Sequence, residues 1–448
     1  MLVTDKEFYR RVLHISIPIA LQSLITIGIN LLDTVMLGRL GETAISGSAL
    51  ANQFINVFQI LCMGMGMGAS VLVSRFYGMG DLNALRRAVT IMYRFCLAIA
   101  ALFTAATLAA PEAILRIYTS EETVVREGAA YLEWMFPGYL LLGFSLTTTL
   151  TLRSVKKVAV PLLSSVGGFF LNVFFNYCLI FGKLGFPRLE VRGAALATMI
   201  SRFFECAVIC GYFWFAEKEV GYRLRHFLLR CGSLTREYFR VSFPVLVSDG
   251  LLALGNSAVA MVIGHMGESY VAANAITVVA QQLSTVLVQG VSQASAIITG
   301  HTLGEGDAEK AQRQGYTFFV MGAVLGAAAG GFIAAFSGVM IGFYDVSAAT
   351  QGIARQLMYS IGIITFFLAT NSILTKGVLR GGGDTRFLMV ADILFLWVVS
   401  VPLGALAGLV WKLPAFWVYF LLKVDQVLKA VWCVRRLQSR KWIKAIQS

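Results

Sequence analysis

One acidic residue lies deep in an apolar part of the sequence. Asp33 belongs to a run that begins near Leu13, and glycines and charged residues end this run in the segment "GRLGE" at 38–42. If the run crosses a bilayer, a carboxylate at this depth costs roughly 2.5–3.5 kcal/mol unless it faces protein or water, pairs with a cation or takes up a proton. Desolvation favours the protonated acid, whereas a nearby cation favours the carboxylate. Asp33 is therefore a candidate group that alternates between protonated and cation-bound forms.

Two amides in another apolar run are the candidate partners of this acid. Asn172 and Asn176 are spaced i, i+4, so both project from one face of a helix. Their carbonyl oxygens beside one carboxylate would suit a monovalent cation, and the same amides would equally hydrogen-bond a protonated Asp33 or join neighbouring helices. The seven cysteines and four histidines have no metal-ligand spacing. The sequence predicts a coupling site for H+ or Na+, with no other metal and no cofactor.

Other polar residues in apolar runs could contact a substrate or form a secondary coupling site. Glu205 has Arg202 at i−3, and Asp425 has Lys429 at i+4, which predicts local charge neutralisation. Lys376 is near enough to a span end to extend its ammonium group into water. The candidate substrate or secondary coupling residues are Asn30, Met36, Phe54, Met65, Tyr139, Asp249, Asn256, Gln281, Asn371 and Asp392.

The composition identifies the solvent of this chain as lipid. Of its 448 residues, 57% are hydrophobic and 14% are charged, too much apolar surface for a soluble domain. The polar segment 216–240 divides the chain into an amino-terminal lobe at 1–215 and a carboxyl-terminal lobe at 241–448. Twelve apolar runs are long enough to cross a bilayer, near 12–37, 50–76, 89–110, 130–152, 160–182, 193–215, 240–264, 275–300, 315–342, 354–379, 388–410 and 414–436.

The net charge of +13 is a topology signal. Most of the 37 Lys and Arg residues fall in loops on the amino-terminal side of the predicted spans. This bias predicts a multi-pass membrane protein with both termini in the cytoplasm. It argues against a nucleic-acid partner, and the sequence indicates no oligomeric state.

The two halves of the chain contain an internal repeat. Six predicted spans separate the copies, so the halves point the same way across the membrane. Parallel repeats of this kind are typical of transporters, with the two bundles related by an axis along the membrane normal. The matched positions are Pro18 and Pro244, Gly38 and Gly264, Glu42 and Glu268, and "GMGD" (78–81) with "GEGD" (304–307).

The polar trio is not repeated. The second half has Val259, Val399 and Leu403 where the first half has Asp33, Asn172 and Asn176. We therefore expect ion coupling in the amino-terminal lobe only.

The same segments resemble the multidrug and toxic compound extrusion (MATE) family. The matching stretches are "DTVMLGRLGE", "GASVLVSRFYGMGD", "LNVFFNYCLIFG", "GHMGESYVAANAI" and "GVLRGGGDTR". The resemblance implies an all-α integral membrane protein of twelve transmembrane helices in two six-helix bundles related by a pseudo-twofold axis. It also implies a cation-coupled antiporter that exports amphipathic, aromatic or cationic small molecules. Several branches of the family pair an acid on helix 1 with an Asn and an Asp on helix 5; here the second position is Asn176, which favours protons over sodium.

Three other functions are weighed against this one. A lipid-linked saccharide flippase of related fold would need several cations in its cavity to bind pyrophosphate, and only Arg202 and Lys376 lie within or beside the predicted spans. An intramembrane enzyme would need a nucleophile–base pair or a metal cluster, and no such motif is present, so we expect no enzyme. A passive channel would conduct without a counter-ion. The expected partners are small-molecule substrates and membrane lipid. The compact loops and the family resemblance together imply a bacterial inner membrane.

Overall fold

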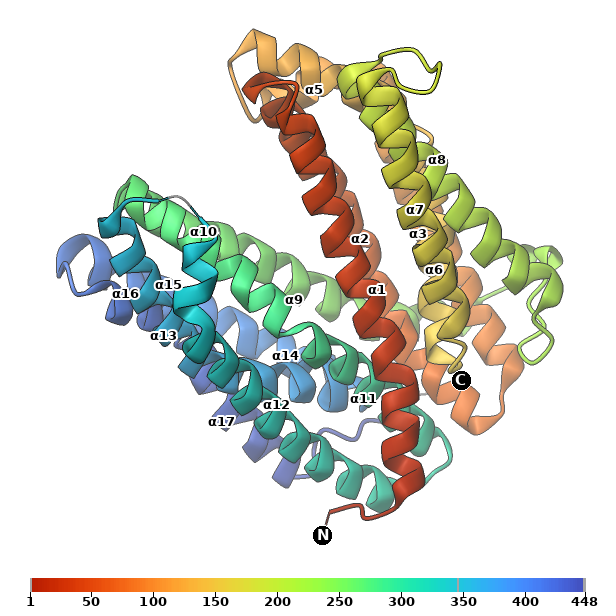
Figure 1. Cartoon of the computed structure of the whole chain (residues 1–448). Coiled ribbons are helices and arrows are strands. Elements are labelled where there is room, and N and C mark those ends of the chain that lie inside the picture. The colour runs from red at the N-terminus through yellow and green to blue at the C-terminus, as the bar shows by residue number, and fades with distance from the viewer. Residues whose placement is uncertain (1, 345, 446–448) are drawn as a thin grey trace. The chain divides into compact units, whose positions relative to one another are not determined.

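The computed structural model describes residues 2–344 and 346–445, and their regular secondary structure is entirely helical. This confirms the predicted all-α fold class (Figure 1). The α-helices are α1 (Lys6–Gly38), α2 (Glu42–Met79), α3 (Leu82–Ala109), α4 (Pro111–Arg116), α5 (Glu122–Met135), α6 (Gly138–Ser154), α7 (Ala159–Phe181), α8 (Glu190–Gly211), α9 (Gly232–His265), α10 (Glu268–Ser284), α11 (Val286–Gly304), α12 (Ala308–Gly342), α13 (Ala348–Ser372), α14 (Thr385–Asp392), α15 (Val401–Ala405), α16 (Ala415–Leu422) and α17 (Asp425–Gln438). Short π-helical turns follow at Tyr212–Ala216, Ile373–Leu379, Ile393–Ser400 and Leu406–Val410, and a 3₁₀ turn lies at Leu224–Leu228.

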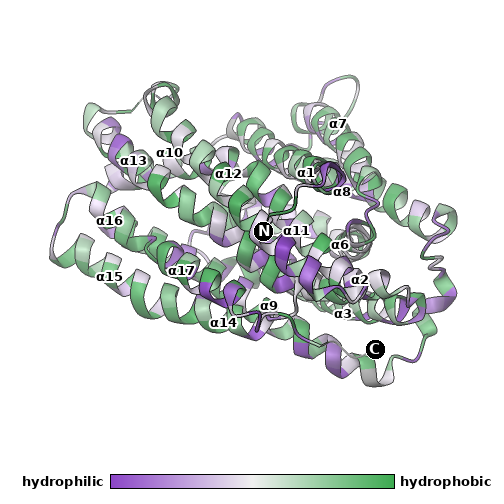
Figure 2. Ribbon diagram, turned by 90° about the horizontal axis from the view of Figure 1, so that it is seen from below, coloured by the Kyte–Doolittle hydropathy of each residue, from purple (hydrophilic) through white to green (hydrophobic). Residues whose placement is uncertain are grey.

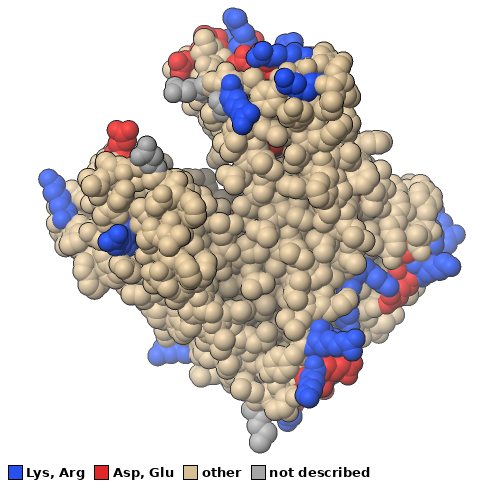
Figure 3. All heavy atoms as spheres, in the orientation of Figure 1, with Lys and Arg blue, Asp and Glu red and all other residues tan. Residues whose placement is uncertain are grey.

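The apolar helices account for most of the predicted spans. Within the described residues, nine helices are long and apolar enough to cross a membrane, and two bent pairs raise the number to eleven. The bent pairs are α5 with α6, at 58°, and α10 with α11, at 49°. Apolar residues dominate the helices in Figure 2, and on the face drawn in Figure 3 the charged side chains gather near helix ends. The predicted count of twelve is thus approximately met.

The twelfth predicted span, 414–436, has a different form from the other spans. It consists of α16 and α17, which Lys423 and Val424 separate. α16 has 8 residues and α17 has 14, and each is shorter than the roughly 20 residues that a single helix needs to cross the hydrocarbon core. α17 also carries Asp425 and Lys429 on its buried side. Charge therefore interrupts this last apolar run.

The chain forms two compact units whose limits differ from the polar segment used to divide the sequence. Unit 1 comprises the described parts of Met1–Ala20, Ser74–Gly80 and Phe239–Ser448, and unit 2 comprises Leu21–Val73 and Asp81–Tyr238. The start of α1 and the end of α2 therefore group with the carboxyl-terminal helices. The predicted segment 216–240 falls largely in unit 2, where Arg86 on α3 donates to the Val220 carbonyl at 2.8 Å. The lobe boundaries 1–215 and 241–448 stay a prediction about function.

Glycines let α11 approach the first two helices within unit 1. A Cβ on Gly290 would lie 2.3 Å from the carbonyl oxygen of Ser16, and one on Gly304 would lie 2.3 Å from that of Arg75. Backbone oxygens cannot move aside as flexible side chains can, so these positions accept only glycine without displacing a helix. Small residues at such contacts allow the close helix packing that stabilises membrane bundles. The glycines explain why segments of α1 and α2 belong to unit 1.

We expect Gly290→Ala to destabilise the protein, because the new methyl group would force α11 away from α1. Gly331→Ala is the matched control, since Gly331 lies in α12 with nothing within 4 Å of its added Cβ. Alanine is favoured over glycine in a helix by about 1 kcal/mol, so the control should keep or raise the melting temperature. Tryptophan fluorescence during thermal unfolding in detergent measures both. Equal melting temperatures for the two variants would contradict the packing argument.

Candidate cation-coupling site

The position of Asp33 on α1 turns its carboxyl group toward the helices of unit 2. Leu31 is 60% exposed and Val35 is 55% exposed, whereas Asp33 between them is half-buried. Residues two positions apart on a helix are separated by about 200°, so Asp33 lies on the side opposite its two apolar neighbours. The Asp33 carboxylate accepts a hydrogen bond of 2.5 Å from the Asn176 side-chain nitrogen. The acid is therefore joined to the bundle interior and does not point at lipid.

The two predicted amides extend this hydrogen bond into a polar chain. Asn172 and Asn176 on α7 are completely buried. The Asn176 Nδ2 donates both to Asp33 and, at 3.0 Å, to Asn172 Oδ1. The Asn172 Nδ2 in turn donates to the hydroxyl of Thr198 on α8 at 3.4 Å. Three helices thus meet through side-chain hydrogen bonds at a position where lipid would offer none.

Only the nitrogen of the Asn176 side-chain amide is hydrogen-bonded within the described residues. Its Oδ1 is buried and has no hydrogen-bond partner among the described residues. A buried acceptor without a donor costs about 1–3 kcal/mol. The unpaired oxygen belongs to the side chain that holds Asp33, so the site offers one more acceptor for a donor or cation beside the carboxylate.

Tyr131, Thr198 and Asn52 extend the site beyond the residues that the sequence indicated. Tyr131 on α5 is 3% exposed, and its hydroxyl interacts with the Thr198 and Asn52 side chains. Asp33 and Arg202 are its charged electrostatic neighbours. A polar side chain inside an apolar run was the available signal for all three. That signal is shared by many residues in this chain, so sequence alone did not single them out.

A second carboxylate in unit 2 is neutralised locally. The Arg202 guanidinium on α8 pairs with Glu205 at 2.9 Å, as the i, i+3 spacing predicts. Arg202 also acts electrostatically on Asp33. Within the described residues, no group of three or more His, Cys, Asp or Glu side chains could hold a metal ion. Unlike Glu205, Asp33 has no basic side chain paired directly with it in the described part of the chain.

Unit 1 contains a separate polar network built around a buried lysine. The Lys429 ammonium on α17 is 2.9 Å from Asp392 and 3.1 Å from Asp425. All three side chains are at least 90% buried, and the Ser248 hydroxyl on α9 donates to Asp392. The Asp425–Lys429 pair follows the predicted i, i+4 neutralisation, but the pairing of Lys429 with Asp392 could not be read from spacing.

Three more polar candidates of unit 1, Asp249, Asn371 and Asn256, also have hydrogen-bond or ion-pair partners. Asp249 pairs with Arg380 at 3.0 Å, and the Asn371 amide donates to Gln426 at 2.8 Å. Asn256 accepts from the Lys423 ammonium at 3.0 Å. These residues lie on several helices of unit 1 and do not form one site. Their role as secondary coupling residues stays a prediction.

The apolar and aromatic candidates are dispersed. Phe54 and Tyr139 lie in one aromatic cluster of unit 2, with ring centroids 6.4 Å apart. Met65 and Tyr139 are almost fully buried, whereas Asn30 is exposed, and Met36 and Gln281 are half-buried. Of the residues predicted from the sequence, the structure brings together Asp33, Asn172 and Asn176. No substrate-contact role follows from where the others lie.

We expect Lys429→Met to destabilise the protein by about 3–5 kcal/mol, because it leaves two buried carboxylates without a cation. Lys310→Met is the control, since its pair with Glu305 spans 3.5 Å with both side chains more than 40% exposed and should contribute at most about 1 kcal/mol. Adding Asp392→Asn and Asp425→Asn to Lys429→Met should restore part of the loss. Chemical denaturation in detergent measures all three; a control that loses as much as Lys429→Met would refute this assignment.

Comparisons with known proteins agree with the helical architecture and with the repeat. The MatE family model matches residues 18–178 and 244–406, once in each half of the chain. A Thermotoga maritima protein named probable multidrug resistance protein NorM is 26% identical over 445 residues, covering 98% of this chain and 94% of its own. A Burkholderia vietnamiensis protein named multidrug resistance protein NorM is 26% identical over 406 residues, covering 87% and 85%.

Solved structures share the fold. A crystal structure of MATE in the straight conformation aligns with a TM-score of 0.87 at 19% identity, covering 96% of both chains. An outward-facing multidrug resistance MATE family transporter of the MOP superfamily aligns with a TM-score of 0.86 at 20% identity, also over 96% of both chains. Because the family model covers most of the sequence and recurs at the internal repeat, this chain belongs to the MATE family of transporters.

Proposed function

We propose that this protein is a proton-coupled antiporter that exports amphipathic, aromatic or cationic small molecules. The observation that supports this proposal most directly is the Asp33 carboxyl group, which is half-buried on α1 and hydrogen-bonded to the completely buried Asn176 on α7. An ionisable residue inside a membrane bundle is a functional candidate by default. The naming of relatives as multidrug resistance proteins supports small-molecule export.

The chemistry depends on the two hydrogen-bonding states open to the Asp33–Asn176 pair. An ionised Asp33 accepts from the Asn176 N–H, which is the arrangement described above. A protonated Asp33 would itself become a donor, and the unpaired Asn176 Oδ1 is an acceptor within the same side chain. Rotation of one amide therefore exchanges the two states. Proton uptake would change how α1 is held against α7.

Coupling requires that the ion favour one conformation over the other. Affinity that is equal in both conformations shifts no equilibrium, however tight the binding. We propose that a proton enters the amino-terminal lobe from outside and binds Asp33. Repacking of α1 against α7 then expels the compound, and the proton leaves when the protein opens inward. In this scheme the two lobes rock about an axis along the membrane normal.

The donor set favours a proton over a sodium ion. A sodium site would draw on the two oxygens of Asp33 and the amide oxygens of Asn176 and Asn172, and Asp33 and Asn172 already accept from the Asn176 N–H. Oxygen-binding cations generally take more ligands than this, and a second carboxylate would be the usual addition. A proton needs one carboxyl and one acceptor. We therefore propose H+ as the coupling ion, with no cofactor.

The acids of unit 1 serve a structural role in this proposal. Asp392 and Asp425 share Lys429, and Asp249 is bound to Arg380, so each has a cation already. Asp33 lacks such a direct partner within residues 2–344 and 346–445, which supports placing the coupling in the amino-terminal lobe alone. The expected setting is a bacterial inner membrane with cytoplasmic termini, and no enzymatic step is involved.

A lipid-linked saccharide flippase is the alternative of related fold. Its pyrophosphate substrate would require unpaired cations in the cavity. Arg202 and Lys429 are each held by carboxylates, which leaves Lys376, an exposed residue, as the cation of the predicted spans without a described carboxylate partner. The relatives reported above carry names of multidrug resistance proteins and MATE transporters, and these do not favour the flippase.

We expect Asp33→Asn to abolish export driven by a proton gradient, because an amide can neither bind nor release the coupling proton. In proteoliposomes the rate of substrate flux under an imposed pH gradient should fall about tenfold or more. Glu121→Gln, an exposed acid before α5, is the control and should retain the wild-type rate. Melting temperatures separate loss of coupling from loss of fold. Undiminished pH-driven export by a folded Asp33→Asn protein would reject the mechanism.

We expect Asn176→Asp to introduce a sodium dependence, because it supplies the second carboxylate that the site lacks. Export should then rise when a sodium gradient is imposed at constant pH, whereas wild type should respond to pH alone. Asn83→Asp on the exposed start of α3 adds the same charge away from the site and should not respond to sodium. If a sodium gradient alone drives export by the wild-type protein, the choice of H+ as the coupling ion is wrong, but the role of Asp33 as the coupling residue is not affected.

A further inference from the structure

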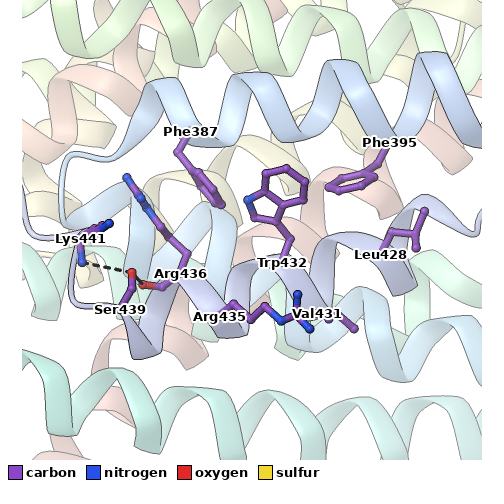
Figure 4. Close-up of a pocket in the computed structure, with 9 residues that line it drawn as sticks. All are labelled: Phe387, Phe395, Leu428, Val431, Trp432, Arg435, Arg436, Ser439 and Lys441. Carbon is purple, nitrogen blue, oxygen red and sulfur yellow. Dashed lines mark hydrogen bonds between the residues drawn. The ribbon is translucent and has the colours of Figure 1, made fainter.

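A groove beside α17 combines aromatic walls with unpaired cations. Its volume is about 770 Å³, within the range of ligand pockets. Phe387, Phe395 and Trp432 form its apolar wall, and Figure 4 shows the Trp432 ring between the two phenyl rings. The Trp432 ring centroid is 5.9 Å from that of Phe387 and 4.9 Å from that of Phe395. Arg435 and Lys441 also line this groove, toward the end of the chain.

The surroundings of this groove face hydrocarbon. Two lining residues on α17 are exposed, Val431 at 52% and Trp432 at 38%. In a membrane protein such exposed apolar residues contact lipid tails. Tryptophan is enriched where the hydrocarbon meets the headgroups. The groove therefore passes from an acyl-chain environment to a basic end.

Two exposed cations of the groove are available for an anion, and Figure 4 draws them apart, with Arg435 extending toward Val431 and Lys441 past Arg436. Arg436 also lines the groove, but its charge is already paired within the protein. Its guanidinium pairs with Asp384 at 2.6 Å and lies 4.7 Å from the centre of the Phe387 ring. Arg435 and Lys441 are exposed, and the described part of the chain provides neither with a carboxylate partner. Because Arg436 is held by Asp384, it fixes the shape of the groove, and Arg435 and Lys441 supply the net positive charge of the groove.

We propose that this groove binds an anionic phospholipid, with its phosphate at the Lys441 end, Arg435 adding positive charge along the groove, and an acyl chain along Phe395 and Trp432. The sign of the charge selects this occupant, because a cationic amphiphile of the exported class would be repelled. Basic pockets between membrane helices on the cytoplasmic side suit phosphate headgroups. This site is independent of Asp33 and lies on the helix that carries Lys429.

The lipid would hold a short helix in place. α17 has 14 residues and is too short to span the bilayer alone. Trp432 follows Lys429 by about one turn of α17, so an acyl chain against Trp432 lies beside the stretch of helix that carries the buried ion pairs. Bound lipid should therefore stabilise unit 1 as well as fill the groove.

The test is native mass spectrometry of the delipidated full chain with added phosphatidylglycerol, and with phosphatidylcholine of the same acyl chains. We expect one phosphatidylglycerol to bind preferentially to wild type and to raise its melting temperature. The double variant Arg435→Gln/Lys441→Gln should weaken this binding by about fivefold for each cation removed. Arg188→Gln/Lys183→Gln, two exposed cations of unit 2, should bind as wild type.

Further arms distinguish the source of the phosphate and the place of the acyl chain. Inorganic phosphate should not reproduce the stabilisation; if it does, the site binds free phosphate and the lipid proposal is overturned. Trp432→Ala should weaken binding of phosphatidylglycerol while leaving the two cations in place. Equal binding of the two lipids, or equal loss in the control double variant, would overturn the proposal as well.

Discussion

A charge inside a membrane bundle must find its partner within the protein, because lipid supplies neither hydrogen bonds nor counter-ions. The two units meet this constraint differently. Unit 1 places Lys429 between Asp392 and Asp425, so its acids carry a permanent cation. In unit 2 the described hydrogen-bond donor to Asp33 is the N–H of the neutral Asn176 amide, and Arg202 acts on Asp33 without pairing with it. A carboxylate held by an amide is stabilised less than one held by an ammonium group, and it can therefore change its protonation state at a lower cost.

This difference gives functional meaning to the loss of the polar trio from the second half of the repeat. The glycines, the proline and the loop motifs recur in both halves, so the fold of each copy was kept. The second copy has apolar residues where the first has Asp33 and its two amides. It carries other acids instead, and these are tied to Lys429 and Arg380. The two copies thus share a scaffold, and the first of them retains a titratable group without a fixed counter-charge.

The sequence predicted those features that depend on short spacing or on an improbable residue type. Asp33 was identifiable because acids are rare in apolar runs, and Asn172 with Asn176 because i, i+4 places them on one face. The pairs Arg202–Glu205 and Asp425–Lys429 follow the same rule. The link from Lys429 to Asp392 joins residues 37 positions apart, and Tyr131 reaches the site from a different helix. Such contacts depend on how helices pack against one another, and the hydrophobic periodicity of one helix does not show which helix lies beside it.

The sequence did not predict the break between α16 and α17 for a related reason. The count of apolar residues over 414–436 averages across the charged residues that interrupt this run.

The continuity of α1 connects the proposed coupling site with the rest of the chain. α1 is a single helix of 33 residues, about 50 Å long, and the boundary between the two compact units falls within it, after Ala20. Its first half is fixed in unit 1, where Ser16 lies against Gly290 with no space for a side chain. Its second half is attached to α7 at two places: Gln22, just past the unit boundary, donates to the Ser165 hydroxyl at 2.8 Å, and Asp33, about three turns further on, accepts from Asn176. In the proposed mechanism, exchange of a proton at Asp33 acts on the end of α1 beyond Gln22, while close backbone packing of Ser16 against Gly290 keeps the first half in place.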